Sequence, residues 1–246
     1  MRAFAHRGGA AHPDLIGLEN THAAFQNAYD QGFRYLETDL HATRDAVLVA
    51  FHDAMLDRVT DSTGRIRDLT AAEVAQATIR GHRIPTMADL LDAFPDVHWN
   101  VDLKSDDAAK PLLDLIEDRG AHDRFTVAAF SPVRLTRFRR LSKGRVETAA
   151  HTFEVLGYRF LPGAIASRLS RAGTLQVPIK NRGLTVLTDG LITRAHAYGC
   201  RVDVWTIDEA DQMHHLIDRG VDGIFSDRID TLKSVLVQRS LWDATD

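Results

Sequence analysis

Three short peptides near the start of the chain combine acidic, imidazole and guanidinium side chains. They are Ala5-His6-Arg7-Gly8, Glu37-Thr38-Asp39 and Phe51-His52-Asp53, and each lies at or just after a stretch that is typical of a β-strand. Acids can hold a divalent cation, an arginine can neutralise an anion, and histidines can donate and accept protons near neutral pH. Phosphate-ester chemistry needs these capacities together.

The length and composition limit the fold and the partners. A chain of 246 residues with 44% apolar residues fits one α/β barrel, because such barrels commonly run to about 250 residues. The net charge of -4 supplies no basic field, so we expect no nucleic-acid partner and no attraction to anionic lipid. No apolar run approaches the roughly 18 residues of a membrane span, and the opening Met-Arg-Ala-Phe-Ala-His leaves no room for a signal peptide. We therefore expect a cytoplasmic protein without stable membrane anchoring, and its oligomeric state stays unknown.

Strand-like and helix-like segments alternate along the chain. Short apolar runs predict strands at residues 2–5, 34–41, 99–104, 125–130, 146–150, 174–179, 201–207 and 223–226. Amphipathic patterns predict helices at residues 21–31, 86–94, 106–119, 132–141, 153–169, 189–198, 209–219 and 230–239, with Asp208 and Asp227 at N-cap positions. Eight strands with eight helices predict a TIM (β/α)8 barrel, in a single domain over residues 1–246. A doubly wound open sheet is the alternative, although no Gly-x-Gly-x-x-Gly follows a strand.

One connection breaks the alternation. Only residues 42–46 separate the second strand from the apolar run 47–51. A crossover helix needs about a dozen residues, so this run must return as an antiparallel arm above the barrel. The arm brings His52 back to the Glu37-Thr38-Asp39 peptide. We expect this hairpin and a small insertion to occupy about residues 42–85.

The strand periodicity places several acids on one face. Residues two apart in a strand point the same way, so Glu37 and Asp39 share a face. Asp102 meets the same condition on the next barrel strand, with Lys104 on its side. At the carboxyl ends of barrel strands this face looks into the mouth, where TIM-barrel sites lie. Three carboxylates without a thiolate suit one hard divalent cation, Mg²⁺ or Ca²⁺, better than zinc.

Of the twelve histidines, only two come directly off strand-like runs toward this rim. They are His6 and His52. Phosphodiester cleavage needs a base for the attacking oxygen and an acid for the departing alkoxide. Two histidines that face each other across one phosphate can fill these roles, but the sequence does not tell which begins as the acid.

The ordered set of peptides resembles the glycerophosphodiester phosphodiesterase family, in its bacterial cytosolic form. The resemblance runs from about residue 2 to residue 234 and implies a TIM barrel of the PLC-like phosphodiesterase type. It also implies hydrolysis of a small-molecule glycerophosphodiester to sn-glycerol 3-phosphate and an alcohol, with Mg²⁺ or Ca²⁺. The peptides that carry it are Ala5-His6-Arg7-Gly8, Glu19-Asn20-Thr21, Glu37-Thr38-Asp39, Phe51-His52-Asp53, Val101-Asp102-Leu103-Lys104 and Val204-Trp205-Thr206.

Matched residue by residue, the resemblance implies a role for each candidate. His6 and His52 take the acid–base positions. The metal-ligand positions fall on Glu37, Asp39 and Asp102, and the substrate-binding positions on Arg7, Lys104, Trp205 and Asn20. Arg7 and Lys104 would neutralise phosphate oxygens and Trp205 would form an apolar wall against glycerol. Asn20 has an equal alternative as a helix N-cap, Arg7 as a structural ion pair, and Trp205 as simple core.

Some features depart from the family pattern and leave two alternatives open. The third ligand position is more often Glu in this family, whereas the related sphingomyelinase D-like branch places Asp there, as Asp102 does here. A lysophospholipase D or sphingomyelinase D-like enzyme would use the same groups on lipid substrates. A non-catalytic metal-binding barrel should have lost at least one ligand or catalytic histidine, and none is lost.

Overall fold

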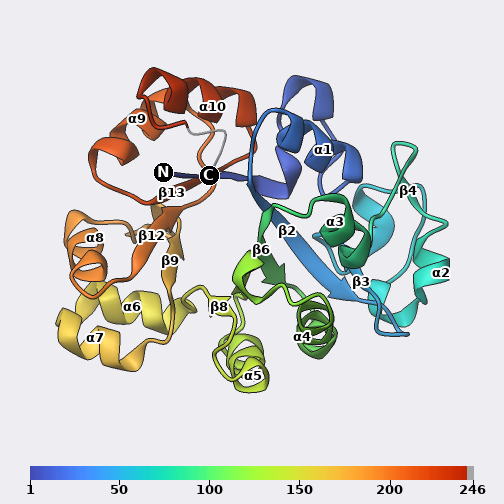
Figure 1. Cartoon of the computed structure of the whole chain (residues 1–246), viewed down its shortest axis with the longest axis horizontal. Helices are drawn as coiled ribbons and strands as arrows, with labels where there is room; N and C mark the ends of the chain where they lie inside the picture. The colour runs from blue at the N-terminus through green and yellow to red at the C-terminus, as the bar shows by residue number, and fades with distance from the viewer. Residues whose placement is uncertain (243–246) are drawn as a thin grey trace.

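Eight parallel strands form the wall of a barrel, and helices cover it (Figure 1). The computed structural model describes residues 1–242. Around the wall the strands follow the order β8-β7-β6-β2-β1-β13-β12-β9. All eight predicted strands are present, at β1 Arg2–Ala5, β2 Tyr35–Ala42, β6 His98–Leu103, β7 Phe125–Ala128, β8 Glu147–Thr148, β9 Thr174–Val177, β12 Arg201–Val204 and β13 Gly223–Ser226.

The ring of strands is nearly closed. The first strand lies beside the last, with Phe4 of β1 opposite Phe225 of β13 and their rings stacked 4.0 Å apart. Between β8 and β9 the wall is completed by one parallel bridge, Ala149 to Thr174. This topology is that of a TIM barrel, as predicted, and it excludes the open doubly wound sheet.

The helices follow the predicted order with one correction. The segment 153–169, predicted as a single helix, is divided at Pro162 into α6 and α7. Proline has no N–H to donate and disfavours helical geometry in the residue before it, and Leu161 is accordingly extended. The helices are α1 His22–Asp30, α3 Met87–Ala93, α4 Ala109–Asp118, α5 Pro132–Ser142, α6 Thr152–Phe160, α7 Gly163–Leu169, α8 Asp189–His196, α9 Ala210–Asp218 and α10 Ile229–Gln238.

Two predicted helix caps are wrong. The N-cap residues of α9 and α10 are Glu209 and Arg228, and neither side chain caps its helix. Asp208 instead reaches across to the start of the other helix, where its Oδ1 accepts the backbone N–H groups of Asp227 and Arg228. The Asp227 carboxylate is therefore not needed as a cap and can face the barrel mouth.

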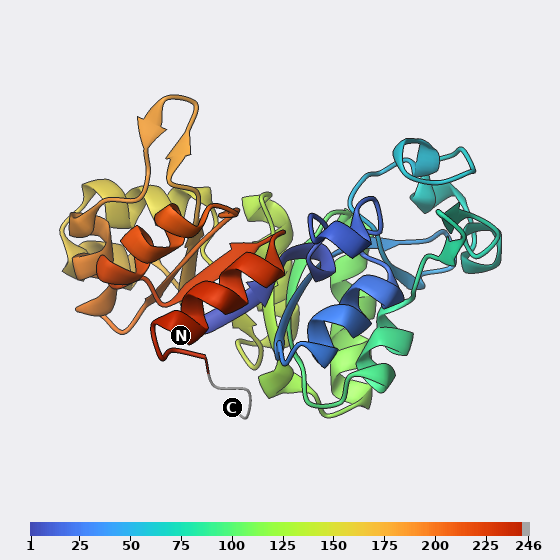
Figure 2. The same cartoon turned by 90° about the horizontal axis from the view of Figure 1, so that it is seen from above.

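The arm after β2 folds back as predicted. Its strand β3, Leu48–Ala50, pairs antiparallel with β2 so that Ala50 lies opposite Leu40. The insertion that follows has a small apolar core of its own and contains α2 Ala71–Val74, β4 Thr78–Ile79 and β5 His82–Arg83. Figure 2 shows this insertion on one side of the molecule, while the hairpin of β10 Lys180–Asn181 and β11 Leu184–Thr185 projects on the other side.

A charged pair lies inside the barrel near the start of the strands. Arg2, Gly223 and Asp203 occupy one row across β1, β13 and β12. Arg2 Nη2 lies 2.7 Å from Asp203 Oδ1, and Thr174 Oγ1 donates to Asp203 Oδ2 at 2.7 Å. A Cβ on Gly223 would lie 2.4 Å from Asp203 Oδ1, so the glycine makes room for the carboxylate.

In the described part of the chain, no helix is long and apolar enough to cross a bilayer.

Candidate active site

Two neighbouring strands, β2 and β6, bring the predicted acids to one region of the barrel interior. In the parallel pairing of β2 with β6, Asp39 lies opposite Asp102, and Glu37 lies opposite Asn100 two positions earlier. All three carboxylates are buried, at 2% exposure for Asp39, 5% for Glu37 and 7% for Asp102. Side chains two apart share a face of a strand, so the barrel wall holds the three acids on its inner side.

The chain turns sharply after β1 and presents His6 and Arg7 to these acids. The turn, His6–Gly8, has φ of 49° at Arg7 and 83° at Gly8. A Cβ on Gly8 would lie 2.7 Å from the Cβ of Ala24 in α1, so only glycine permits this approach. The Arg7 N–H donates to Glu37 Oε2 at 3.0 Å, and its guanidinium Nε lies 3.2 Å from Asp39 Oδ2.

His6 lies between two carboxylates. Its Nδ1 is 2.8 Å from Asp227 Oδ1, and its Nε2 is 3.8 Å from Glu37 Oε2. Burial lowers the pKa of His6, but Glu37 and Asp227 outweigh burial and raise the pKa above its ordinary value. Asp227 follows β13, so the last barrel strand orients the histidine that follows the first.

The folded-back arm positions His52 through backbone contacts. Phe51 N–H donates to the carbonyl of Asp39 at 2.9 Å, and His41 Nε2 lies 3.2 Å from the carbonyl of His52. The Nδ1 atom of His52 lies 2.7 Å from Asp53 Oδ1. Both candidate histidines therefore have an aspartate at Nδ1, which leaves Nε2 as the nitrogen for proton transfer.

The acids differ in charge because their neighbours differ. Burial and the like charge of Asp39 raise the pKa of Glu37 to about 7. Burial acts in the same direction on Asp39, but Lys104 and Arg7 outweigh it and hold the pKa of Asp39 below its ordinary value. Lys104 Nζ lies 3.0 Å from Asp39 Oδ1 and 2.5 Å from Asp102 Oδ2, and these carboxylates raise the lysine pKa despite its burial.

The carboxylates do not form a ready-made metal cage. In residues 1–242, no three His, Cys, Asp or Glu side chains converge as metal ligands, and the Lys104 ammonium lies between Asp39 and Asp102. The donor set nevertheless fits a hard divalent cation, because it offers only oxygen ligands. Asp102 Oδ1 is buried and has no hydrogen-bond partner among the described residues, and burial raises the pKa of this acid although Lys104 opposes the rise. The site therefore has an unused buried oxygen for a cation.

The Asn20 side chain binds the Asp39 carboxylate and does not cap a helix. Its Nδ2 donates to Asp39 Oδ2 at 3.0 Å, and its Oδ1 accepts from Thr38 Oγ1 at 2.8 Å. Helix α1 is capped by the next residue, Thr21, so the N-cap alternative for Asn20 is wrong. With both ends of its amide engaged and 1% of its surface exposed, Asn20 is placed to hold Asp39.

The aromatic part of the site comes from two loops. Trp205 follows β12, and its indole meets the ring of Phe130 edge-on at 5.8 Å between centroids. Phe130, which follows β7, is 65% exposed, and Lys104 Nζ lies 5.5 Å from its ring centroid. The aromatic pair thus lies next to the lysine that contacts Asp39 and Asp102.

Comparison with known proteins identifies the family. The sequence profile described as "Glycerophosphoryl diester phosphodiesterase family" matches residues 6–231. The chain belongs to this family. The "Probable glycerophosphodiester phosphodiesterase 2" of Mycobacterium tuberculosis is 40% identical, over 98% of this chain and 92% of the relative.

Solved structures share the fold. A glycerophosphodiester phosphodiesterase from Parabacteroides distasonis has a TM-score of 0.80 at 22% identity, over 97% of this chain and 98% of that chain. A phosphodiesterase from Oleispira antarctica, solved in complex with the product sn-glycerol-3-phosphate, has a TM-score of 0.80 at 21% identity, over 96% and 97% of the two chains. As a member of this family, the chain is a phosphodiesterase with a TIM-barrel fold.

Three residues of this candidate site were not predicted from the sequence to belong to it. They are Asp53, Phe130 and Asp227, which lie against His52, Trp205 and His6. Each lies at or just after the end of a strand-like run, as His6 and His52 do. Position at a strand end could therefore have indicated these residues, but the sequence pattern at Asp227 also fits a helix N-cap.

Proposed function

We propose that the protein hydrolyses glycerophosphodiesters in the cytoplasm, releasing sn-glycerol 3-phosphate and an alcohol. The observation that carries the proposal is the pair of imidazoles, each with an aspartate at Nδ1, beside three buried carboxylates. The name of the M. tuberculosis relative and the product bound in the Oleispira structure support this substrate class.

In the proposed site, Glu37, Asp39 and Asp102 would hold one divalent cation, Mg²⁺ or Ca²⁺. The cation would neutralise the nonbridging phosphate oxygens, an effect typically worth several kcal/mol in a water-poor site. Asn20 would keep Asp39 in place for this role. Arg7 would add a second positive charge against the phosphate.

The two histidines would move the protons. One imidazole takes the proton of the glycerol 2-hydroxyl as its oxygen attacks phosphorus, and the other gives a proton to the alcohol whose P–O bond breaks. The cyclic phosphate is then opened by water with the roles reversed. Lys104 would orient the phosphate, while Trp205 and Phe130 would shield the glycerol carbons from solvent.

The test compares histidine variants on defined substrates. Glycerophosphocholine, glycerophosphoethanolamine and a lysophospholipid are supplied with Mg²⁺ or Ca²⁺, and glycerol 3-phosphate is detected by a coupled enzyme. We expect His6→Ala and His52→Ala to lower turnover by at least about 10²-fold, the usual worth of positioned acid–base catalysis. His215→Ala, on the exposed side of α9, is the matched control and should keep full activity.

Three outcomes would each overturn part of the proposal. Normal turnover by folded His52→Ala protein would remove the acid–base assignment. Activity on the lysophospholipid alone would replace the glycerophosphodiester substrate with a lipid one. Full activity after chelation, in metal-free buffer, would remove the cation from the mechanism.

A further inference from the structure

Exposed apolar side chains are concentrated on α6, α7 and the β10–β11 hairpin. Fifteen large apolar side chains of the described residues are exposed, and seven of them lie within residues 153–184. Phe153, Phe160 and Leu169 expose 69%, 60% and 68% of their surface. We name this region the α6–α7 surface, and its apolar members are Phe153, Leu156, Phe160, Leu161, Ile165, Leu169 and Leu184.

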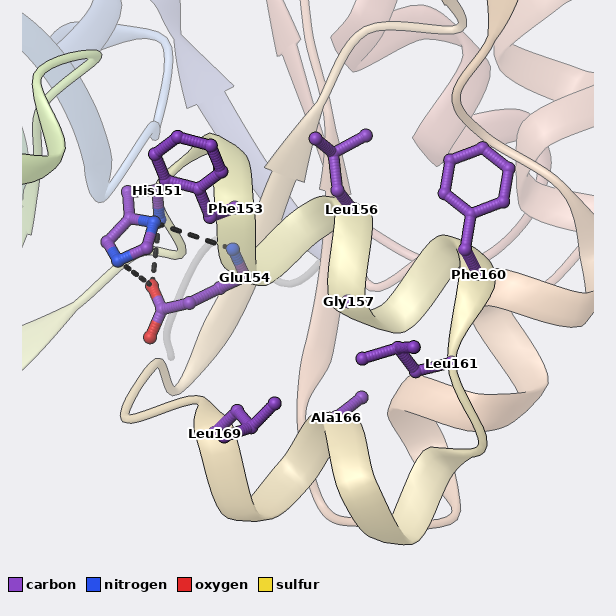
Figure 3. Close-up of a pocket in the computed structure, with 9 residues that line it drawn as sticks. All are labelled: His151, Phe153, Glu154, Leu156, Gly157, Phe160, Leu161, Ala166 and Leu169. Atoms are coloured by element: carbon purple, nitrogen blue, oxygen red, sulfur yellow. Dashed lines mark hydrogen bonds and ion pairs between the residues drawn. The ribbon is translucent and has the colours of Figure 1, made fainter.

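A groove runs between the two helices of this surface. Pro162 ends α6 and reverses the chain, so that α7 returns along α6 (Figure 3). Gly157 and Ala166 meet where the helices approach, since a Cβ on Gly157 would lie 4.0 Å from the Cβ of Ala166. Small residues at the contact leave the larger side chains at the rim of a groove of about 400 Å³. Leu161 and Leu169 line this groove. Apolar side chains left at a surface groove are typical of a binding site.

The stretch of chain that carries this surface is rich in basic residues. Residues 155–188 contain five basic residues and neither Asp nor Glu. Because the whole chain has a net charge of -4 and this stretch contributes +5, the remainder carries -9. The five basic residues are Arg159, Arg168, Arg171, Lys180 and Arg182. Within residues 1–242, no carboxylate lies within ion-pair distance of any of them. The expectation that the chain offers no basic field holds for the total charge but not for this surface.

The hairpin and the helices form one continuous surface. Arg159 of α6 donates from Nε to the carbonyl of Thr185 in β11 at 3.3 Å, and its guanidinium carbon lies 4.8 Å from the centroid of the Phe160 ring. Arg159 therefore joins the hairpin, with its exposed Lys180 and Arg182, to α6 and the Phe160 ring.

We propose that the α6–α7 surface binds reversibly to the surface of an anionic phospholipid membrane. Exposed aromatic and aliphatic side chains can enter the interface between headgroups and acyl chains, while unpaired Arg and Lys attract anionic headgroups. A second copy of this face is a poor partner, because the five positive charges of one copy would repel the five of the other. Nucleic acid would use the basic residues but would leave most of the apolar rim in water. This inference goes beyond hydrolysis, since none of these residues belongs to the proposed catalytic site.

The experiment is sedimentation of the full chain with lipid vesicles. One set contains phosphatidylcholine alone, and the other contains phosphatidylcholine mixed with phosphatidylglycerol. We expect binding to the mixed vesicles only, weakened by added salt because exposed charges are screened. Lys180→Glu/Arg182→Glu should weaken binding by more than about tenfold, since each basic residue near such a surface contributes several-fold in affinity. Phe160→Ser/Leu169→Ser should also weaken it.

Matched controls separate this surface from the rest of the molecule. Val237→Ser changes an exposed apolar residue on α10, and Arg83→Glu reverses an exposed charge in the insertion. Both should bind vesicles like the unchanged protein, and all variants should keep hydrolysis of glycerophosphocholine. The proposal is overturned if the unchanged protein does not bind phosphatidylglycerol vesicles at low salt. It is also overturned if the control variants lose as much binding as the variants of the α6–α7 surface. A dimer in sedimentation velocity that Phe160→Ser/Leu169→Ser dissociates would assign the surface to self-association instead.

Discussion

Removal of the positive charge beside Asp203 should destabilise the barrel in a pH-dependent way. The Asp203 side chain has no exposed surface, and its carboxylate is held by Arg2 and by the hydroxyl of Thr174. Burial raises the pKa of Asp203 from 3.8 to about 6, although Arg2 opposes the rise. Arg2→Met keeps the bulk of the side chain but takes away the only cationic group that contacts Asp203 in the described residues.

The magnitude follows from the proton affinity of Asp203. A tenfold change in proton affinity corresponds to about 1.4 kcal/mol, so a pKa of about 6 in place of 3.8 means that ionised Asp203 costs the folded state roughly 3 kcal/mol. Because the folded pKa is the higher one, the stability associated with this group is present below pH 3.8 and is lost as the pH rises through about 6. Without Arg2, the pKa of Asp203 in the folded protein rises further, so the loss of folding stability continues to a higher pH. The variant should therefore lose about 3–5 kcal/mol at alkaline pH and little at mildly acidic pH, where Asp203 is largely protonated in both proteins.

Urea unfolding at a pH below 6 and at a pH well above it, followed by tryptophan fluorescence, measures this difference. Arg119→Met is the control, because Arg119 pairs with Asp92 at 2.8 Å on the exposed surface, and its loss should cost under about 1 kcal/mol at either pH. Adding Asp203→Asn to Arg2→Met should restore much of the stability at the higher pH. Equal losses at both pH values would show that Arg2 acts through packing and would refute this reasoning.

Three further outcomes concern the mouth of the barrel. Asp227→Asn should lower kcat by about 10-fold or more with a smaller change in KM, since it loosens the orientation of His6, and steady-state kinetics at several pH values would detect this. Gly8→Ala should lower the free energy of unfolding by more than about 2 kcal/mol in a denaturant titration, because the new Cβ meets Ala24 and φ is positive. Asp102→Asn should raise the metal concentration needed for half-maximal activity by about tenfold or more, whereas unchanged metal dependence would remove this residue from the ligand set.

The strands and the returning arm could be predicted because their signals are local. Each barrel strand is a short apolar run with β-branched or aromatic residues, and all eight were located. The short connection at residues 42–46 required an antiparallel return, and β3 pairs with β2 accordingly. The face shared by Glu37 and Asp39 followed from strand periodicity, whereas its pairing with Asp102 depended on which strands are neighbours.

The remaining errors come from interactions between distant segments. Asp227 was expected to cap the helix after it, but Asp208 from the preceding loop supplies those hydrogen bonds, and the Asp227 side chain bonds His6 instead. Nothing near Asp227 in the sequence shows this exchange. The break at Pro162 had a local signal, but apolar residues continue on both sides of it. Tyr158 of α6 and Ala166 of α7 are buried, whereas most of the other apolar residues in this segment are exposed.

The pairing of β1 with β13 also determines when the molecule becomes complete during synthesis. A ribosome releases β1 long before β13. The edge of β1 that pairs with β13 therefore stays unpaired while most of the chain is made. His6 emerges with that first strand, and its partner Asp227 follows 221 residues later. A nascent chain can therefore assemble the Glu37, Asp39 and Asp102 region early, but it cannot orient His6. If His6 acts as proposed, catalytic competence should appear only when the final strand has docked against the first.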